Sequence, residues 1–343
     1  MGAVVTTMHV DNVYNKASYC GILRWCKQVA WQARAFRPGL PIVIFHNAAE
    51  AFRRRGRTEH QDVRAALQQE CPDARVVDFD PELFAAAESW LQRRASDDAR
   101  ASSRCPGYGS TLGPLLKWQA VDPRQYASGE QQPVLYLDSD VDAGWYIPSA
   151  GILRRHRLGD KLAEFAASPC RLCASPDHAA PMNAGIMLLK PNASDYREGL
   201  DLLRTRSFSR AEGFNRTGSL RKALNATLAA LGPRGREELT RTGGYSKDSW
   251  DFVCGDSDQG LFTTVYMARH ARRFCVPKHP RRPVVHHFWA GDKPWHDPPS
   301  CSRYFDFVAG GAQANATPCA RYLASKRQKL VRSRCRGHGV PVF

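Results

Sequence analysis

Short apolar runs alternate with stretches of helical spacing in the first part of the chain. Residues 4–8, 41–46 and 75–79 are rich in β-branched or aromatic side chains and are short enough to be buried strands. Asp11 and Asn12 follow the first run as a helix-start signal, and residues 62–70 have helical spacing. Strands that alternate with helices predict an α/β fold with a mainly parallel sheet and helices on both faces.

The pattern continues in the second part of the chain. Helical spacing indicates helices over residues 115–121 and from about residue 258. The stretches 93–113 and 205–249 are polar and rich in arginine, and they are predicted to be a loop and an insertion. Three further apolar runs predict strands at residues 134–137, 186–189 and 284–288.

The domain organisation follows from where these signals stop. Beyond about residue 300 the chain becomes rich in Gly, Ala, Cys and Arg, with little periodicity. We expect a single catalytic-size domain over residues 1–300 and a basic, cysteine-containing tail over residues 301–343. No apolar run approaches the roughly 20 residues that a membrane-spanning helix needs, so no span is expected in this chain.

The net charge of +16 would attract any polyanion, including nucleic acid, acidic polysaccharide, an anionic membrane and a diphosphate compound. The arginines are spread over the whole chain. They are not accompanied by a zinc-finger spacing, an aromatic RNA-binding pattern or a basic heptad region. We therefore expect no specific nucleic-acid partner.

Cysteines and asparagines bear on the compartment. The chain has 11 cysteines, a high number for a cytosolic enzyme. Cys170 and Cys173 are spaced as C-x-x-C without a second pair, which favours packing or a disulfide over a metal site. Half of the chain's eight asparagines begin N-glycosylation sequons, namely Asn192, Asn215, Asn225 and Asn315. The cysteines and the sequons together favour a secretory compartment such as the Golgi lumen. The alternative is a cytoplasmic protein in which the cysteines are structural thiols.

The strongest chemical signal is an apolar strand that ends on carboxylates. Residues 134–137 read V-L-Y-L, and Asp138 and Asp140 follow one residue apart. Carboxylates this close repel each other, and a hard divalent cation with oxygen ligands is the usual way to relieve that repulsion. Such a cation would also suit a diphosphate. The alternative is that the aspartates only cap the end of the strand.

In six blocks, this one among them, the chain resembles glycosyltransferase family 8, the glycogenin-like transferases. The blocks have the family's order over residues 3–295, with long insertions left unmatched. The resemblance implies a GT-A type, Rossmann-like fold and the transfer of a hexosyl group from a UDP-sugar with retention of the anomeric configuration. The blocks are V-T-T at 5–7 with Asn12 and Tyr14, then Lys117, D-S-D at 138–140, M-N-A-G-I-M-L-L-K-P at 182–191, D-Q-G at 258–260, and V-V-H-H-F at 284–288 leading to K-P-W at 293–295.

A metal site is the first implication of the resemblance. Asp138 and Asp140 would bind Mn²⁺, or Mg²⁺, between the phosphates of the donor, and one histidine from residues 284–288 would complete the ligand shell. Either His286 or His287 fits, because family members differ by one residue in the spacing from this histidine to the K-P-W block.

Donor and catalytic residues are implied in the same way. Asn183, Ala184 and Gly185 would approach the sugar, while Asp258 and Gln259 would lie near its anomeric carbon. Lys293 would stabilise the leaving diphosphate. The remaining residues expected at the donor are Thr6, Thr7, Asn12 and Tyr14 around the uracil, and Lys117.

The chain also departs from the family. Gly255 stands where some members carry a carboxylate, with Asp256 one position later, and Thr263 stands where asparagine is common. Tyr266 is the single tyrosine between Gln259 and His286, which argues against a self-glucosylating primer protein. The acceptor and the oligomeric state are not specified by the sequence. The alternative function is a non-catalytic, lectin-like or polyanion-binding protein on a transferase scaffold.

Overall fold

The computed structural model describes most of the central part of the chain. The longer described segments are residues 3–8, 41–46, 71–97, 112–126, 132–138, 163–174, 182–208 and 257–275. The shorter described pieces are residues 25, 68, 141–142, 214, 229, 232–233, 245–246, 249–250, 255, 286–287 and 340–341.

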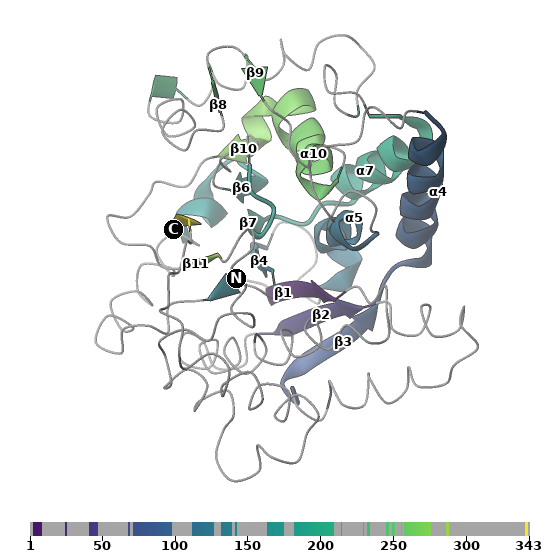
Figure 1. Ribbon diagram of the computed structural model, residues 1–343. Coiled ribbons are helices and arrows are strands. Elements are labelled where there is room, and N and C mark those ends of the chain that lie inside the picture. Colours follow the sequence, from purple (N-terminus) through teal and green to yellow (C-terminus); the bar gives the residue numbers. More distant parts are fainter. Residues whose placement is uncertain are drawn as a thin grey trace, which may run out of the picture.

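A seven-stranded sheet lies at the centre of the described chain, with the strand order β10-β6-β7-β4-β1-β2-β3 (Figure 1). Neighbouring strands are parallel except at β7, which runs antiparallel to both β4 and β6. The predicted α/β fold with a mainly parallel sheet is therefore confirmed. The strands are β1 (Ala3–Met8), β2 (Ile42–His46), β3 (Ala74–Asp78), β4 (Val134–Leu137), β6 (Leu172–Ala174), β7 (Ile186–Leu189) and β10 (Phe274–Cys275).

Helices cover one face of this sheet. Side chains that alternate along the strands, such as Val5 and Tyr136, belong to one hydrophobic cluster with residues of these helices. Figure 1 shows the helices grouped on the same side, where α4 packs on α7. They are α4 (Pro81–Asp97), α5 (Gly113–Leu116), the 3₁₀ helix η1 (Lys117–Val121), α7 (Ala193–Thr205), α10 (Asp258–Phe262) and the π-helix η3 (Thr263–Arg269).

The opposite face of the sheet is buried as well. Val4, Ile44 and Leu135 point to this second face, and each is at most 4% exposed. The helices predicted directly after β1 and β2 lie outside the described residues, apart from Trp25 and Gln68, which are helical. The helix predicted over residues 115–121 corresponds to α5 and η1. None of the helices in the described part of the chain is long and apolar enough to cross a membrane.

A second, three-stranded sheet has the order β12-β11-β5 and is antiparallel. Its strands are β5 (Val141–Asp142), β11 (His286–His287) and β12 (Val340–Pro341). Two residues of the predicted tail thus pair with the predicted histidine strand. The predicted domain boundary near residue 300 lies outside the described residues. A hairpin of β8 (Tyr245–Ser246) and β9 (Ser249–Trp250) lies at the end of the predicted polar insertion.

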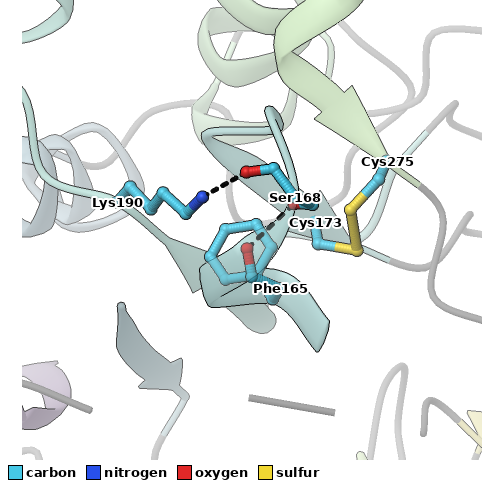
Figure 2. The surroundings of a disulfide bond; sticks show 5 residues. All are labelled: Phe165, Ser168, Cys173, Lys190 and Cys275. Carbon is cyan, nitrogen blue, oxygen red and sulfur yellow. Dashed lines mark hydrogen bonds between the residues drawn. A yellow bond between two sulfur atoms is a disulfide. The ribbon is translucent and has the colours of Figure 1, made fainter. Parts of the chain in front are cut away.

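A disulfide joins two parallel strands at one side of the main sheet. Cys173 in β6 and Cys275 in β10 are register partners and are bonded to each other (Figure 2). Cys170 is a free thiol. Close to this disulfide, the Lys190 ammonium donates to the Ser168 carbonyl oxygen and lies above the Phe165 ring. The predicted disulfide or packing role of the C-x-x-C pair is confirmed for Cys173.

Candidate functional site

One lysine side chain holds two carboxylates from distant parts of the sequence. The Lys117 ammonium lies 2.8 Å from Asp138 Oδ2 and 2.7 Å from Asp258 Oδ2. The three side chains are only 13%, 21% and 9% exposed, respectively. The sequence predicts Lys117 at the donor, Asp138 at the metal and Asp258 at the catalytic centre. In the structure the three side chains lie together.

The topology explains why these residues meet. Asp138 directly follows β4, at the edge of the sheet where the parallel strands β1, β2, β3 and β4 have their carboxyl ends. Lys117 is the first residue of η1, and Asp258 is the first residue of α10. Both helices belong to the layer of helices that covers one face of the sheet, as described above. Ligands of open α/β sheets bind at this edge.

Two hydroxyl groups form a chain of hydrogen bonds that ends on Asp138. The Tyr136 hydroxyl donates to Asp138 Oδ1 at 2.9 Å. Because a phenol has a single proton to donate, the Thr7 hydroxyl must be the donor in its 2.7 Å contact with the Tyr136 oxygen. Sequence reasoning missed Tyr136. The two-residue period of a strand could have found it, since Tyr136 and Asp138 point to the same face.

Asp258 is fixed by its own loop and helix. Its Oδ1 accepts hydrogen bonds of 2.9 Å from the Ser257 hydroxyl and from the Gln259 backbone N–H. A Cβ at Gly260 would lie 1.4 Å from the Gly255 carbonyl oxygen, so only glycine fits there. Gly255 therefore contributes its backbone carbonyl to this close packing. Ser257 was also missed from the sequence.

The turn before β7 reaches the same edge because β7 runs in the opposite direction to β4. The Gly185 carbonyl oxygen accepts a 2.7 Å hydrogen bond from the Asp138 N–H. Asn183 Oδ1 accepts the Gly185 N–H at 2.8 Å, and the Asn183, Ala184 and Gly185 residues are all buried. The sequence predicts that these three residues approach the donor, beside the D-x-D motif. In the structure their backbone lies beside Asp138, the first residue of that motif.

The electrostatics of the cluster favour a bound cation. Burial alone would lower the pKa of Lys117, but the charges of Asp138 and Asp258 outweigh it and hold this pKa well above its usual value. Lys117 therefore stays cationic. One ammonium faces two carboxylates, so one negative charge of the cluster has no counter-charge within it. Burial and the Asp138 charge also raise the pKa of Tyr136, so the phenol keeps the proton that it donates.

The backbone brings the predicted histidines next to the acidic motif. Strand β5 begins directly after Asp140, and β11 pairs with it so that His286 lies opposite Asp142 and His287 opposite Val141. The described residues contain no group of three or more His, Cys, Asp and Glu side chains that could hold a metal. Asp140 and the side chains of both histidines lie outside them. Carboxylates and an imidazole at a site of negative charge form a donor set that fits Mn²⁺.

The other expected donor residues divide into two groups. Thr6 is fully buried, and its hydroxyl has no hydrogen-bond partner within the described segments. The Thr7 hydroxyl is bonded to Tyr136, as described above. Asn12, Tyr14 and Lys293 fall outside the residues that the structure describes.

Two other sequence features acquire structural roles. Tyr266 in η3 is 0% exposed, so it is not an accessible acceptor for self-glucosylation. Asn192 is 8% exposed and caps α7, where its side-chain oxygen accepts the N–H groups of Ser194 and Asp195. The first sequon is therefore a helix cap in this fold, which leaves three sequons as signals of glycosylation.

No protein-family model and no curated protein sequence matches the chain. Among solved structures it is similar to mouse xyloside xylosyltransferase 1, apo form, with 13% identity, 100% of this chain and 96% of that chain covered, and a TM-score of 0.36. It is also similar to the galactosyltransferase LgtC in complex with donor and acceptor sugar analogues, with 14% identity, 96% and 97% coverage, and a TM-score of 0.34. An active-site mutant of LgtC gives a TM-score of 0.33. These proteins are glycosyltransferases, but the scores are too low to transfer residue roles.

Proposed function

We propose that the chain is a retaining glycosyltransferase of the GT-A type that moves a hexosyl group from a UDP-sugar to an acceptor. The observation that carries this proposal is the convergence of Asp138 and Asp258 on the Lys117 ammonium at the carboxyl edge of the sheet. The six sequence blocks named above support it, because they contain all three of these residues. The acceptor and the sugar are not specified by these residues.

Mn²⁺ would be held by Asp138, Asp140 and one of His286 and His287. When bound, the metal would neutralise charge on the diphosphate of the donor. The chain prepares this position by orienting Asp138: Lys117 and Tyr136 each contact one of its oxygens. Lys293 is proposed to add a second positive charge on the leaving phosphate.

Asp258 is proposed to position the sugar rather than attack it. Its Oδ1 accepts two hydrogen bonds, and its Oδ2 is paired with Lys117, so the lone pairs of the carboxylate are largely engaged. A front-face reaction is consistent with this. The bond from the anomeric carbon to the β-phosphate oxygen breaks, a bond to the acceptor oxygen forms on the same face, and the acceptor proton passes to the departing phosphate.

A secretory compartment is proposed for the same chain. The Cys173–Cys275 disulfide supports it, since disulfides persist in oxidising compartments. The Asn192 sequon no longer does, because Asn192 is buried where its side chain caps α7. Protein secreted from eukaryotic cells should lose mass on N-glycan removal, with peptide mapping that finds glycan at the later sequons and none at Asn192.

The activity is tested by donor hydrolysis, which needs no known acceptor. A panel of UDP-sugars is incubated with the protein, with and without Mn²⁺, and the release of UDP is measured. We expect slow, Mn²⁺-dependent hydrolysis of one or a few donors, lost in Asp258→Asn and kept in the exposed helix control Asp201→Asn. Release of UDP from none of the donors, together with salt-sensitive heparin binding, would favour the polyanion-binding alternative.

A further inference from the structure

The side chain that follows Lys117 is wedged between two helices. Trp118 is 0% exposed, and its indole Nε1 donates a 3.0 Å hydrogen bond to the Tyr196 carbonyl oxygen of α7. The Nε1, Cε2 and Cζ2 atoms of the indole lie against Gly199 of the same helix, where an added Cβ would be 2.1 Å from Cε2. Glycine is thus required at position 199 for the indole to lie against α7.

The same indole packs on the helix that carries Asp258. Its ring centroid is 4.8 Å from that of Phe262 in α10 and 6.0 Å from that of Tyr266 in η3. Phe262 is four residues after Asp258, about one helical turn, so both lie on the same side of α10. Aromatic pairs at these distances stabilise a fixed arrangement.

Neither helical segment that carries the ion pair is long enough to fix its own position. The helix η1 continues α5 over residues 113–121, and α10 continues into η3 over residues 258–269. Isolated helices shorter than about 12–15 residues are only marginally stable, so tertiary packing must place both segments. Trp118 supplies that packing to both: it is adjacent to Lys117 in η1, and it contacts α10 one turn from Asp258. The ring in turn is held on the 13-residue helix α7 by a hydrogen bond and by the space at Gly199.

We propose that Trp118 and Gly199 are positioning residues that set the placement of the Lys117 ammonium relative to Asp258. The proposal rests on the proposed function for its catalytic consequence, whereas its geometric part stands alone. Neither residue is expected to contact the donor. A role in core packing alone would predict a change of stability without a change at Lys117.

The test uses Gly199→Ala, Trp118→Phe and the double variant, with Asp201→Ala on the exposed side of α7 as the control. A double-mutant cycle of Gly199→Ala with Lys117→Met, measured by urea unfolding at pH 7, reports how far the position of the indole is coupled to the ion pair, and the UDP-sugar hydrolysis assay gives kcat and KM. If Gly199→Ala moves the ammonium away from Asp258, Lys117→Met should cost less free energy of unfolding in the Gly199→Ala background than in the wild type. In Gly199→Ala we also expect kcat to drop about tenfold or more, with the donor KM little changed.

The double variant gives the sharpest signature. Phenylalanine has neither the ring nitrogen nor the fused second ring of the indole, to which the atoms that an added Cβ at position 199 would meet belong. Trp118→Phe should therefore restore part of the loss caused by Gly199→Ala, so that the two changes are not additive. If Gly199→Ala fails to fold, the comparison of Trp118→Phe and the double variant with the wild type carries the test.

Two results separate this proposal from the function it builds on. An additive cycle between Gly199→Ala and Lys117→Met, together with an unchanged kcat in variants of lowered Tm, would overturn the positioning role. If the wild type hydrolyses no UDP-sugar, the proposed function fails, and the cycle between Gly199→Ala and Lys117→Met alone then decides whether Trp118 and Gly199 place the ammonium.

Discussion

At the residue scale, the Lys117 side chain pairs with carboxylates from two different elements. It lies between Asp138 and Asp258, and its charge is what allows two carboxylates to be buried side by side. Its pKa is raised in the fold, so its stabilising effect is fully present below the usual lysine pKa of 10.5 and is lost as the pH rises through the higher folded value. Tyr136, whose pKa is also raised, contributes to the same alkaline loss.

Lys117→Met should therefore lower the free energy of unfolding at pH 7 by about 3 kcal/mol, because two buried carboxylates lose their counter-charge. In the same variant, the free energy of unfolding should fall less steeply above about pH 10.5 than in the wild type, although it should still fall. Urea unfolding at pH 7 and at alkaline pH measures both effects. Lys190→Met is the matched control, since burial lowers the pKa of Lys190 and its removal should not flatten the alkaline fall. Equal alkaline behaviour of the two variants would contradict the assignment.

The sequence predicts these residues individually but not their contacts. Lys117, Asp138 and Asp258 follow from the motifs, whereas the bridge between the two carboxylates depends on how β4, η1 and α10 meet. Tyr136 was read as part of an apolar strand, which it also is. Its second role arises because its hydroxyl reaches the end of the strand, where Asp138 lies.

At the scale of elements, burial decides what could be predicted. The strands β1, β2, β4 and β7 are buried almost entirely and appear in the sequence as apolar runs. The strands β6 and β10 have three and two residues, too few for any periodicity, and are stabilised by neighbours and by the disulfide. Helix α4 was missed and overlaps a predicted loop from residue 93, although Asp80 and Pro81 form a recognisable helix start.

Asn192 offers a test at this scale. Its side-chain oxygen caps α7, and a substitution that removes the acceptor leaves the first N–H groups of the helix without a partner. Asn192→Ala should cost about 1 kcal/mol in the free energy of unfolding, measured by urea denaturation. Asn192→Asp retains an acceptor and removes the sequon, so it should be close to the wild type. Equal losses in the two variants would show that the cap does not stabilise α7.

At the scale of the whole molecule, the Cys173–Cys275 disulfide closes a loop across 102 residues of sequence. Between its ends lie β7, α7 and α10, so the cross-link limits the unfolded chain over much of the site-bearing region. Replacement of both cysteines by alanine should lower the free energy of unfolding by about 3 kcal/mol. Denaturant unfolding measures this. Cys170→Ala, which removes a free thiol, is the control, and a loss of the same size there would contradict the role of the disulfide.

The α/β class follows from the order of apolar and helical segments, but the assembled site does not. It depends on the reversed direction of β7, on the close contact of Gly260 with Gly255, and on the indole between α7 and α10. Each is a long-range or steric property that no local pattern contains.

The central claim is that the Lys117, Asp138 and Asp258 cluster forms part of a metal-dependent UDP site. Calorimetric titration of UDP into the protein, with and without Mn²⁺, tests it most directly, since UDP binding needs neither the correct sugar nor an acceptor. The account predicts Mn²⁺-dependent binding by the wild type and by the Asp201→Asn control, with at least about a tenfold loss of affinity in Asp138→Asn that retains its fold. UDP affinity that is absent from the wild type, or unchanged in folded Asp138→Asn, would contradict it.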